Sequence, residues 1–555
     1  MAELIASAAW AQRELLSAPP PCDAERAEAV WKATLEEAGP GKEWLRGPYT
    51  PEELRKELGP RWLGARRFGI VQSGKLRLID DFSEFHQNAA TGLPEKLAAG
   101  GLDEVVGLAK AWVRVVRPDR TVEVSLSTGE EMRGVLHPTW SYEEAVDLVG
   151  RTIDLKSAYK RMAIKPAHQF AAVIAVCSVE ERRWTLWIPR AMPFGASTAV
   201  HGFSRVALVL RQIAVRGLGL VVTNYLDDYP LLESRVLGES ASSSVLELLQ
   251  ILGWQVSQDP KKVRPFDKDM AVLGVVLGLE GLAKGANLTL TNKPERVEDI
   301  LQMVARVKSD NQLSPALAAT LRGRLLYAEQ QCVGRCGIMA TRALGVRAQE
   351  PGGRVELTPQ LRRALEWVEA FLADTRPREV CTGPQPPPVV IFTDGACKGE
   401  GFKDVTVGGV MFAPSGRCEA FEMRVPEQVA RRWPSGKAGQ SIGQAELYPV
   451  AVAKATWRQY IEGRQVIYFI DNDSARFALI RHYSPHEASA DIIWQAAAMD
   501  IEARSSSWYA RVASASNVAD APSRLRIEEV VRAFGAEKVE TVIPTVLGWA
   551  EEVGQ

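Results

Sequence analysis

Two segments in the first part of the chain alternate apolar and polar residues on either side of a short turn. RRFGIVQSGKLRLIDDF (66–82) does so around Ser73-Gly74, and VEVSLSTGEEMRGVLH (122–137) does so around Thr128-Gly129. Successive side chains of a strand point to opposite faces, and glycine tolerates the backbone angles of tight turns. Both segments are therefore predicted to be β-hairpins.

The pattern further along predicts more strands and then a run of helices. TIDLKSAYKRMAI (152–164) begins with a short strand that ends at Asp154. AVLGVVLG has the form of an apolar hairpin around Leu273-Gly274, although such glycine hairpins are common in unrelated proteins. Residues 294–345 have helical periods that break at SDNQLSP.

TRPREVCTGPQPPP, residues 375–388, is the clearest linker, because its prolines disfavour both a helix and a central strand. Early strands and then alternating helices and strands follow it, which predicts a mixed sheet with helices on its faces. The expected strands are 389–395, 405–414, 418–425, 465–471 and 506–513, and the expected helices are 443–457 and 474–483.

Composition limits the class of protein. A chain of 555 residues is too long for one hydrophobic core, so several domains are expected. Its 46% hydrophobic and 24% charged residues are typical of a soluble globular protein, and its seven scattered cysteines favour a reducing compartment. No segment approaches the ~20 apolar residues that cross a bilayer. We expect an intracellular protein, cytoplasmic or nuclear, without membrane contact; the net charge of −1 leaves the partner open.

Two adjacent aspartates interrupt an otherwise apolar segment, VVTNYLDDYPLL (221–232). Carboxylates this close repel each other, and burying either is costly without a counter-charge. If neighbouring strands bring Asp154 beside Asp227 and Asp228, two Mg²⁺ ions about 4 Å apart would neutralise all three and bind a phosphate. Taken alone, however, Asp-Asp is ordinary turn chemistry.

Five motifs occur in the order TIDLKSAY, AMPFG, NYLDDY, LGW with DPKKV, and AVLGVVLG. In this order and at these spacings they resemble the palm of a reverse transcriptase. The resemblance is closest to retroelement enzymes of the DIRS-like or gypsy-like arrangement, in which RNase H follows the polymerase, and it covers residues 60–530.

The resemblance implies an α/β fold, with right-hand fingers, palm and thumb followed by an RNase H-like mixed-sheet domain. The implied parts are an N-terminal helical extension (1–50), fingers and palm (51–280, with an insert at 98–150), a helical thumb or connection (281–374), the linker (375–388), the RNase H-like domain (389–530) and a C-terminal tail (531–555).

Roles for the first group of acidic residues follow from the resemblance alone. It implies that Asp154 and Asp227 are metal ligands, that Asp228 completes the acidic pair, and that Leu155 offers a backbone carbonyl. Lys262 matches a lysine near the leaving pyrophosphate that acts as a general acid, with the register open by one residue because Lys261 precedes it.

The resemblance also implies substrate contacts. Tyr159 matches the aromatic gate that crowds a ribose 2′-OH, and Arg77, assisted by Lys75, matches the fingers arginine that holds the triphosphate. Phe194 stands where many retroviral enzymes have glutamine, so Gly195 and the backbone would pack against the template. Taken singly, a core aromatic and a solvated charge remain alternatives.

The part after the linker carries a second ordered set of acidic residues. Asp394 ends VVIFT, Glu446 lies in the helix of GQAELYPV, Asp471 ends VIYFI, and Asp520 lies in NVADAPSR. This set resembles RNase H, in which four acids converge on two Mg²⁺ ions and activate water against the RNA strand of a hybrid.

The resemblance therefore implies an RNA-directed DNA polymerase of a retrotransposon, with RNase H activity and two Mg²⁺ or Mn²⁺ ions per active site. The implied partners are an RNA template, a DNA or RNA primer, an RNA/DNA hybrid and dNTPs; the oligomeric state stays open. A catalytically idle nucleic-acid-binding remnant of such an enzyme is the alternative. An RNA-templated RNA polymerase is disfavoured by Tyr159 and by the second acidic set.

Overall fold

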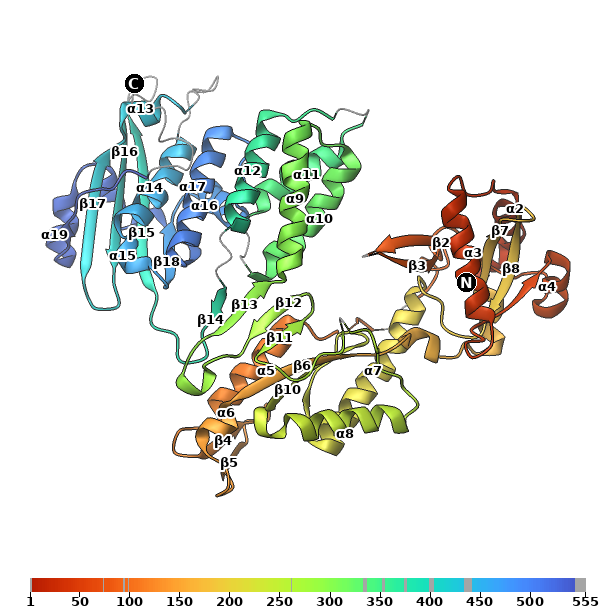
Figure 1. Cartoon of the computed structure of the whole chain (residues 1–555). Coiled ribbons are helices and arrows are strands. Elements are labelled where there is room, and N and C mark those ends of the chain that lie inside the picture. The colour runs from red at the N-terminus through yellow and green to blue at the C-terminus, as the bar shows by residue number, and fades with distance from the viewer. Residues whose placement is uncertain are drawn as a thin grey trace. The chain divides into compact units, whose positions relative to one another are not determined.

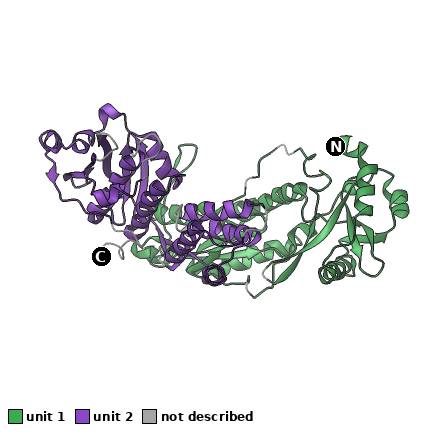
Figure 2. Cartoon of the chain, turned by 90° about the horizontal axis from the view of Figure 1, so that it is seen from above, with its two compact units in different colours: residues 1–288 green, residues 289–555 purple. Residues whose placement is uncertain are grey.

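The computed structural model of the chain (Figure 1) divides into two compact units, residues 1–288 and 289–555, which Figure 2 colours separately. The structure describes residues 2–544 apart from 73, 93–94, 98, 261, 333–336, 352–354, 374–376, 399–403 and 434–441, and leaves out the side chains of 330–332. Among the described helices, none is long and apolar enough to cross a membrane.

The first unit begins with a five-stranded sheet whose order is β1-β8-β7-β2-β3. Its strands are β1 (Leu45–Tyr49), β2 (Gly64–Gln72), β3 (Lys75–Asp80), β7 (Val173–Ser178) and β8 (Arg183–Pro189), and the helices before and between them are α1 (Ala2–Ala6), α2 (Ala8–Ser17), α3 (Ala24–Ala38) and α4 (Pro51–Leu58). The predicted β2–β3 hairpin is present. The predicted helical extension over residues 1–50 also contains β1, which pairs antiparallel with β8.

A three-stranded sheet of order β6-β10-β9 forms the other half of this unit. Helix α7 and helix α8 bury it through Phe203, Leu210 and Val245, which pack against Ile153 and Leu231 of the sheet. The elements are β6 (Leu148–Asp154), β9 (Val221–Val222), β10 (Asp228–Ser234), α7 (Ser197–Leu218) and α8 (Gly238–Ile251).

The remaining elements of the first unit are mostly hairpins. The predicted hairpin around Thr128-Gly129 is present as β4 and β5, and the one around Leu273-Gly274 is present as β11 and β12. The elements are α5 (Leu102–Val115), β4 (Thr121–Ser125), β5 (Glu131–Val135), α6 (Tyr142–Val146), β11 (Asp269–Val272) and β12 (Val275–Gly278); β13 (Leu288–Asn292) follows at the boundary of the units.

The second unit starts with the predicted helical region. The break expected at SDNQLSP is found between α9 and α10, where Asn311 ends α9 in the left-handed conformation. The helices are α9 (Pro294–Asp310), α10 (Pro315–Cys332), α11 (Ile338–Gln349) and α12 (Pro359–Ala373), and they share one apolar core. Short strand β14 (Arg378–Val380) lies within the proline-rich linker, whose residues 375–376 fall outside the described residues.

A six-stranded mixed sheet of order β19-β18-β15-β16-β17-β20 completes the second unit. Strand β15 pairs in parallel with β18 and antiparallel with β16, so the mixed α/β fold class is confirmed. The strands are β15 (Val389–Lys398), β16 (Asp404–Phe412), β17 (Cys418–Arg424), β18 (Gln465–Ile470), β19 (Ser506–Arg511) and β20 (Glu537–Lys538).

Helices flank this sheet, as the sequence predicted, but only α14 and α16 were foreseen. Helix α17 lies where no element was predicted, and it packs against α14 through Ile492, Ile493 and Ala496 of the main core. The helices are α13 (Glu427–Ala430), α14 (Ile442–Thr456), α15 (Arg458–Ile461), α16 (Asp473–Arg481), α17 (Glu487–Ala503), α18 (Asp520–Ser523) and α19 (Ile527–Phe534).

Candidate active sites

Antiparallel pairing of β6 with β10 brings the first three aspartates together. Asp228 is the register partner of Asp154, although 73 residues lie between them in the chain. The N–H of Leu155 donates to the carbonyl oxygen of Asp227 at 3.1 Å, which ties the end of β6 to the turn before β10. We call Asp154, Asp227 and Asp228 the first carboxylate site.

Asp227 lies at the tip of a two-residue turn. Tyr225 and Asp228 exchange both backbone hydrogen bonds across this turn, at 2.9 and 3.0 Å. Leu226, between them, has φ +53°, in the left-handed region, which costs a branched residue about 1–2 kcal/mol. The paired strands on either side hold this unfavourable conformation, so the orientation of Asp227 is set by the sheet.

Lys262 provides a positive charge at this site. Its Nζ pairs with Asp154 Oδ1 at 2.5 Å, and its N–H donates to the carbonyl of Asp259 at 2.7 Å. Lys261, the other candidate, falls outside the described residues. The structure therefore places Lys262 against a carboxylate of the first site.

Burial and mutual repulsion shape the charges of the two adjacent aspartates. Burial is the largest cause that raises the pKa of Asp228, to about 7, and the charges of Asp227 and Asp154 add to it. Burial also raises the pKa of Asp227, while the charges of Lys262 and Arg77 oppose the rise. At neutral pH the site therefore holds fewer negative charges than three separate aspartates would, unless a cation is added.

Tyr159 borders the first carboxylate site. Its ring meets those of Phe194 and Phe203, at centroid distances of 6.1 and 5.0 Å. Burial, followed by the charge of Asp227, raises the pKa of its hydroxyl to about 12, so the hydroxyl keeps its proton at any working pH. The half-buried ring thus combines core packing with proximity to the acidic residues.

The AMPFG segment fits closely against the end of β3. A Cβ at Gly195, where φ is +123°, would lie 2.1 Å from the carbonyl oxygen of Asp80, so only glycine fits. The carbonyl of Phe194 accepts a hydrogen bond from the Asp80 N–H at 2.8 Å. The ring of Phe194 stays 41% exposed, as a surface that contacts a ligand would be.

The two cations of the β2–β3 hairpin differ in position. The charge of Arg77 is close enough to lower the pKa of Asp227, and the side chain is exposed. Lys75 instead pairs with Asp259. Arg77 is therefore near the first site, whereas Lys75 contacts Asp259, which lies three residues before Lys262.

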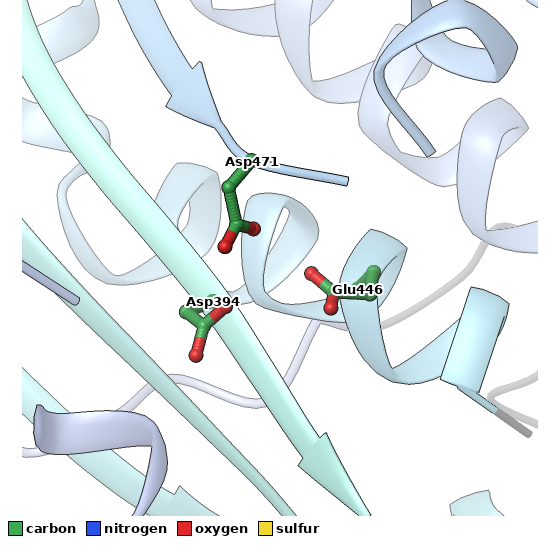
Figure 3. Close-up of side chains that lie close together, drawn as sticks. All are labelled: Asp394, Glu446 and Asp471. Carbon is green, nitrogen blue, oxygen red and sulfur yellow. The ribbon is translucent and has the colours of Figure 1, made fainter. Parts of the chain in front are cut away.

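The second acidic cluster is tighter. One ligand oxygen each of Asp394, Glu446 and Asp471 lies within 4.8 Å of the others, and Figure 3 shows the three side chains directed towards one another from two strands and a helix. We call these three residues the second carboxylate site. Among the described residues, the first site does not form so close a group, and Asp154 is paired there with Lys262.

The sheet explains where these residues lie. Asp394 was expected at the end of its strand, but β15 continues to Lys398 beside β16. Its parallel pairing with β18 stops at Phe392, and Asp471 follows the last residue of β18. The two aspartates therefore lie where β15 and β18 separate, an edge where parallel sheets commonly hold ligands.

Helix α14 brings Glu446 to the same edge because Gly395 has no side chain. A Cβ at Gly395 would lie 2.0 Å from the carbonyl oxygen of Ala445. The closeness lets the backbone N–H of Gly395 donate a hydrogen bond to the Glu446 carboxylate. Gly395 is thus the contact that permits this helix and strand to share a site.

The second site is strongly perturbed. Burial, followed by the charges of Asp394 and Asp471, raises the pKa of Glu446 to about 9. Burial likewise raises the pKa of Asp394 to about 6, against the opposing hydrogen bond from Ser523. Buried oxygens Glu446 Oε2 and Asp471 Oδ1 have no hydrogen-bond partner in the described part of the chain.

Asp520 lies apart from the other three acids. Its carboxylate pairs with Arg524 at 2.8 Å and with Arg526 at 3.5 Å, although its charge still raises the pKa of Asp394. The sequence did not point to Ser523, whose hydroxyl donates to Asp394 Oδ2 at 2.5 Å. Its position three residues after Asp520, on α18, is the one feature of the sequence that could have suggested a place near the site.

Both sites have the chemistry of a hard cation site. Carboxylate oxygens are the ligands that Mg²⁺ and Mn²⁺ prefer, and the unpartnered buried oxygens of the second site need a cation or protons. Asp154, Asp227 and Asp228 fit such an ion if Lys262 moves from Asp154. Asp394, Glu446 and Asp471 fit one as they stand.

The fold and these clusters define the class as a mixed α/β protein with two separate carboxylate sites at strand ends. No family model matches the sequence, and no curated protein is significantly similar to it. A similar solved structure is that of the foamy viral protease-reverse transcriptase in complex with dsDNA; the match has 13% sequence identity and a TM-score of 0.43, and covers 88% of this chain and 83% of that chain.

Proposed function

We propose that the chain is an RNA-directed DNA polymerase with a second, RNase H activity, and that it derives from a retrotransposon of the DIRS-like or gypsy-like kind. The observation that carries the proposal is the register of Asp154 with Asp228 in an antiparallel pair of strands beside Tyr159. A second carboxylate cluster, on a mixed sheet later in the chain, supports the nuclease activity.

At the first carboxylate site, a primer 3′-OH would attack the α-phosphate of a bound dNTP in line. Mg²⁺ or Mn²⁺ ions held by Asp154, Asp227 and Asp228 would neutralise charge on the reacting phosphate. The exposed guanidinium of Arg77 would bind the triphosphate oxygens. Lys262 lies against Asp154 with half its side chain exposed, where it could donate a proton to the departing pyrophosphate.

Selection of the sugar would fall to Tyr159. Its ring is held by Phe203 on one side and Phe194 on another, so it cannot easily turn away from a ribose 2′-OH. A ring that is packed in this way would crowd a ribose 2′-OH and leave room for a deoxyribose. Phe194 and Gly195 would provide the surface next to the template base.

At the second carboxylate site, the substrate would be the RNA strand of an RNA/DNA hybrid. Asp394, Glu446 and Asp471 supply the charge that binds two divalent ions, which would activate water for phosphodiester hydrolysis. Arg524, beside Asp520 and close enough to lower the pKa of Asp394, is placed to bind a phosphate. The substrates would thus be a primed RNA template with dNTPs, and the hybrid they produce.

The test measures both activities in the unmodified full chain and in variants that should each remove only one of them. With Mg²⁺, dNTPs and a primed RNA, the unmodified chain should extend the primer and cleave a labelled hybrid. Asp227→Asn with Asp228→Asn should abolish extension and leave cleavage measurable, whereas Asp394→Asn should do the reverse. If the unmodified chain makes no DNA, the polymerase proposal is wrong and the idle-remnant alternative replaces it.

A further inference from the structure

A series of buried ion pairs, through Lys160, Glu37, Arg67 and Asp80, joins helix α3 to the core of the first unit. Arg67, on β2, has a side chain that is 1% exposed and lies between two carboxylates. Its Nε is 2.7 Å from Asp80 Oδ1, and its Nη1 is 2.8 Å from Glu37 Oε2. Glu37 comes from α3, so this helix contributes a charge to the sheet interior.

Glu37 has a second cationic partner. The same Oε2 atom lies 3.1 Å from Nζ of Lys160, and both side chains are 12% exposed. Lys160 also lies over the ring of Trp44, at 5.8 Å from its centroid. Because Lys160 follows Tyr159 directly, in a 3-10 helix at Ala158–Arg161, this contact holds the backbone that carries the Tyr159 ring.

Asp80, at the other end of this series of charged residues, is connected to the same ring through Phe194. The backbone of Asp80 donates to the carbonyl of Phe194, and Gly195 leaves no space between the two segments. The ring of Phe194 then meets the ring of Tyr159 edge-on, with an interplanar angle of 86°. The contacts therefore form a closed path that begins and ends at Tyr159.

The charges along this path are strong enough to matter. Burial raises the pKa of Glu37, but the charges of Arg67 and Lys160 lower it by more. The pKa therefore lies below its ordinary value, and the carboxylate is ionised at neutral pH. Removing one partner of a buried ion pair leaves an uncompensated charge, whereas exposed pairs contribute little. A change at Glu37 or Lys160 should therefore shift the Tyr159 segment.

We propose that Glu37 and Lys160 are positioning residues that set the preference of the polymerase site for deoxynucleotides, by fixing the backbone beside Tyr159. The inference rests on the proposed polymerase function. It gives the N-terminal helix α3 a part in substrate choice, although α3 precedes every motif of the polymerase.

The test measures single-nucleotide incorporation by the full chain with a dNTP and with the matching rNTP. Glu37→Gln and Lys160→Gln should each reduce the ratio of kcat/KM for dNTP over rNTP about tenfold. The rNTP efficiency should rise and the dNTP efficiency fall, which a general loss of folded protein would not produce. Glu37→Gln removes the carboxylate that Lys160 pairs with, so adding Lys160→Gln to it should cost little further discrimination.

A matched control is available at the neighbouring position. Glu36 pairs with Lys42 on the surface, with side chains that are 70% and 41% exposed, so Glu36→Gln should leave the ratio unchanged. Hybrid cleavage depends on the second unit, so folding of the first unit is checked separately, by thermal unfolding of each variant beside the unmodified chain. Should Glu37→Gln fail to fold, Lys160→Gln decides, because it leaves both carboxylates of Arg67 in place.

The outcomes separate the two proposals. Wild-type extension with a ratio that stays within about twofold in both variants overturns the positioning role alone. An equal loss of discrimination in Glu36→Gln also overturns it, because the effect would then not depend on the buried contacts of Glu37. A wild-type chain that makes no DNA overturns the polymerase proposal and the positioning role together.

Discussion

The two carboxylate sites balance the same kind of charge in different ways. In the first site, Lys262 pairs with Asp154, and the charge of Arg77 reaches Asp227. In the second site, no salt bridge to Asp394, Glu446 or Asp471 is found among the described residues, and two buried oxygens lack partners. The first site carries its own cation, whereas the second depends on protons or on added ions.

This difference is electrostatic in origin. Carboxylates in a poorly solvated place must be protonated or neutralised, since repulsion and burial both disfavour the charged form. Burial and neighbouring carboxylates raise the pKa of Glu446 to about 9 and that of Asp228 to about 7, so the charged form is disfavoured more strongly at the second site. Substitutions in the two sites should therefore differ in how they change the dependence on divalent ions.

The largest expected effect is on hybrid cleavage by Glu446→Gln. Loss of a carboxylate from the second site should lower the cleavage rate about a thousandfold or more, with primer extension unchanged. Asp520→Asn should cost much less, because Asp520 is engaged by Arg524 and Arg526. Initial rates on a labelled hybrid measure both, and equal losses would contradict the arrangement seen here.

The next effect concerns Lys262. If Lys262 is the general acid, as proposed, Lys262→Met should lower extension about a hundredfold. It should also lower the Mg²⁺ concentration needed for half-maximal extension, because Asp154 would no longer be paired. Lys268→Met, which removes a cation paired with Asp147 and Glu280 in the same unit, serves as the control. An unchanged Mg²⁺ requirement would show that the Lys262–Asp154 pair does not compete with the ion.

Stability should depend on pH when divalent ions are removed. Glu446 binds a proton in the folded state up to about pH 9, but in the unfolded state only up to its ordinary pKa of 4.5. Folding takes up a proton between these values, so the free energy of unfolding should fall as pH rises from 5 to 9.

Glu446→Gln should reduce this slope, and Mg²⁺ should flatten it, since ligands that bind only the folded state stabilise it. Urea unfolding of the full chain in EDTA and in Mg²⁺, at several pH values, tests the point. A slope that is the same in all conditions would mean that the second site is not the source.

The smallest expected effect comes from two glycines. Gly395→Ala should destabilise the second unit by about 1–3 kcal/mol, because the new Cβ would meet the backbone of α14. Gly150→Ala, in β6, should cost less, since its Cβ would meet the flexible side chain of Met270. Gly443→Ala, with open space around it, is the control. Thermal unfolding ranks the three, and a harmless Gly395→Ala would mean that α14 can shift.

Local sequence patterns predicted the elements that present the acidic residues. The helix of Glu446 and the strand before Asp471 lie within a residue of the expected bounds. The strand before Asp154 ends where it was expected to end, but it begins at Leu148, four residues earlier than the expected segment. Patterns of this kind are readable because one face of each element is buried. The order of motifs then indicated which elements should meet.

Other features depended on contacts that no local pattern contains. Strand β1, LRGPY, includes a proline and lacks alternation, so its pairing with β8 follows from tertiary structure. Helix α17 is rich in alanine, which weakens its apolar period. The bonds from Ser523 to Asp394 and from Lys262 to Asp154 join residues 129 and 108 positions apart, so only the folded chain shows them.

The pairing of β15 with β18 also bears on the order in which the chain folds. Val389 lies beside Val466, so the centre of this sheet cannot close until most of the second unit has been synthesised. Contacts of such long range are slow to form. The nascent chain would thus emerge from the ribosome with Asp394 exposed. The hydrogen bond from Ser523, which offsets part of the cost of burying this carboxylate, can form only after residue 523 has been synthesised.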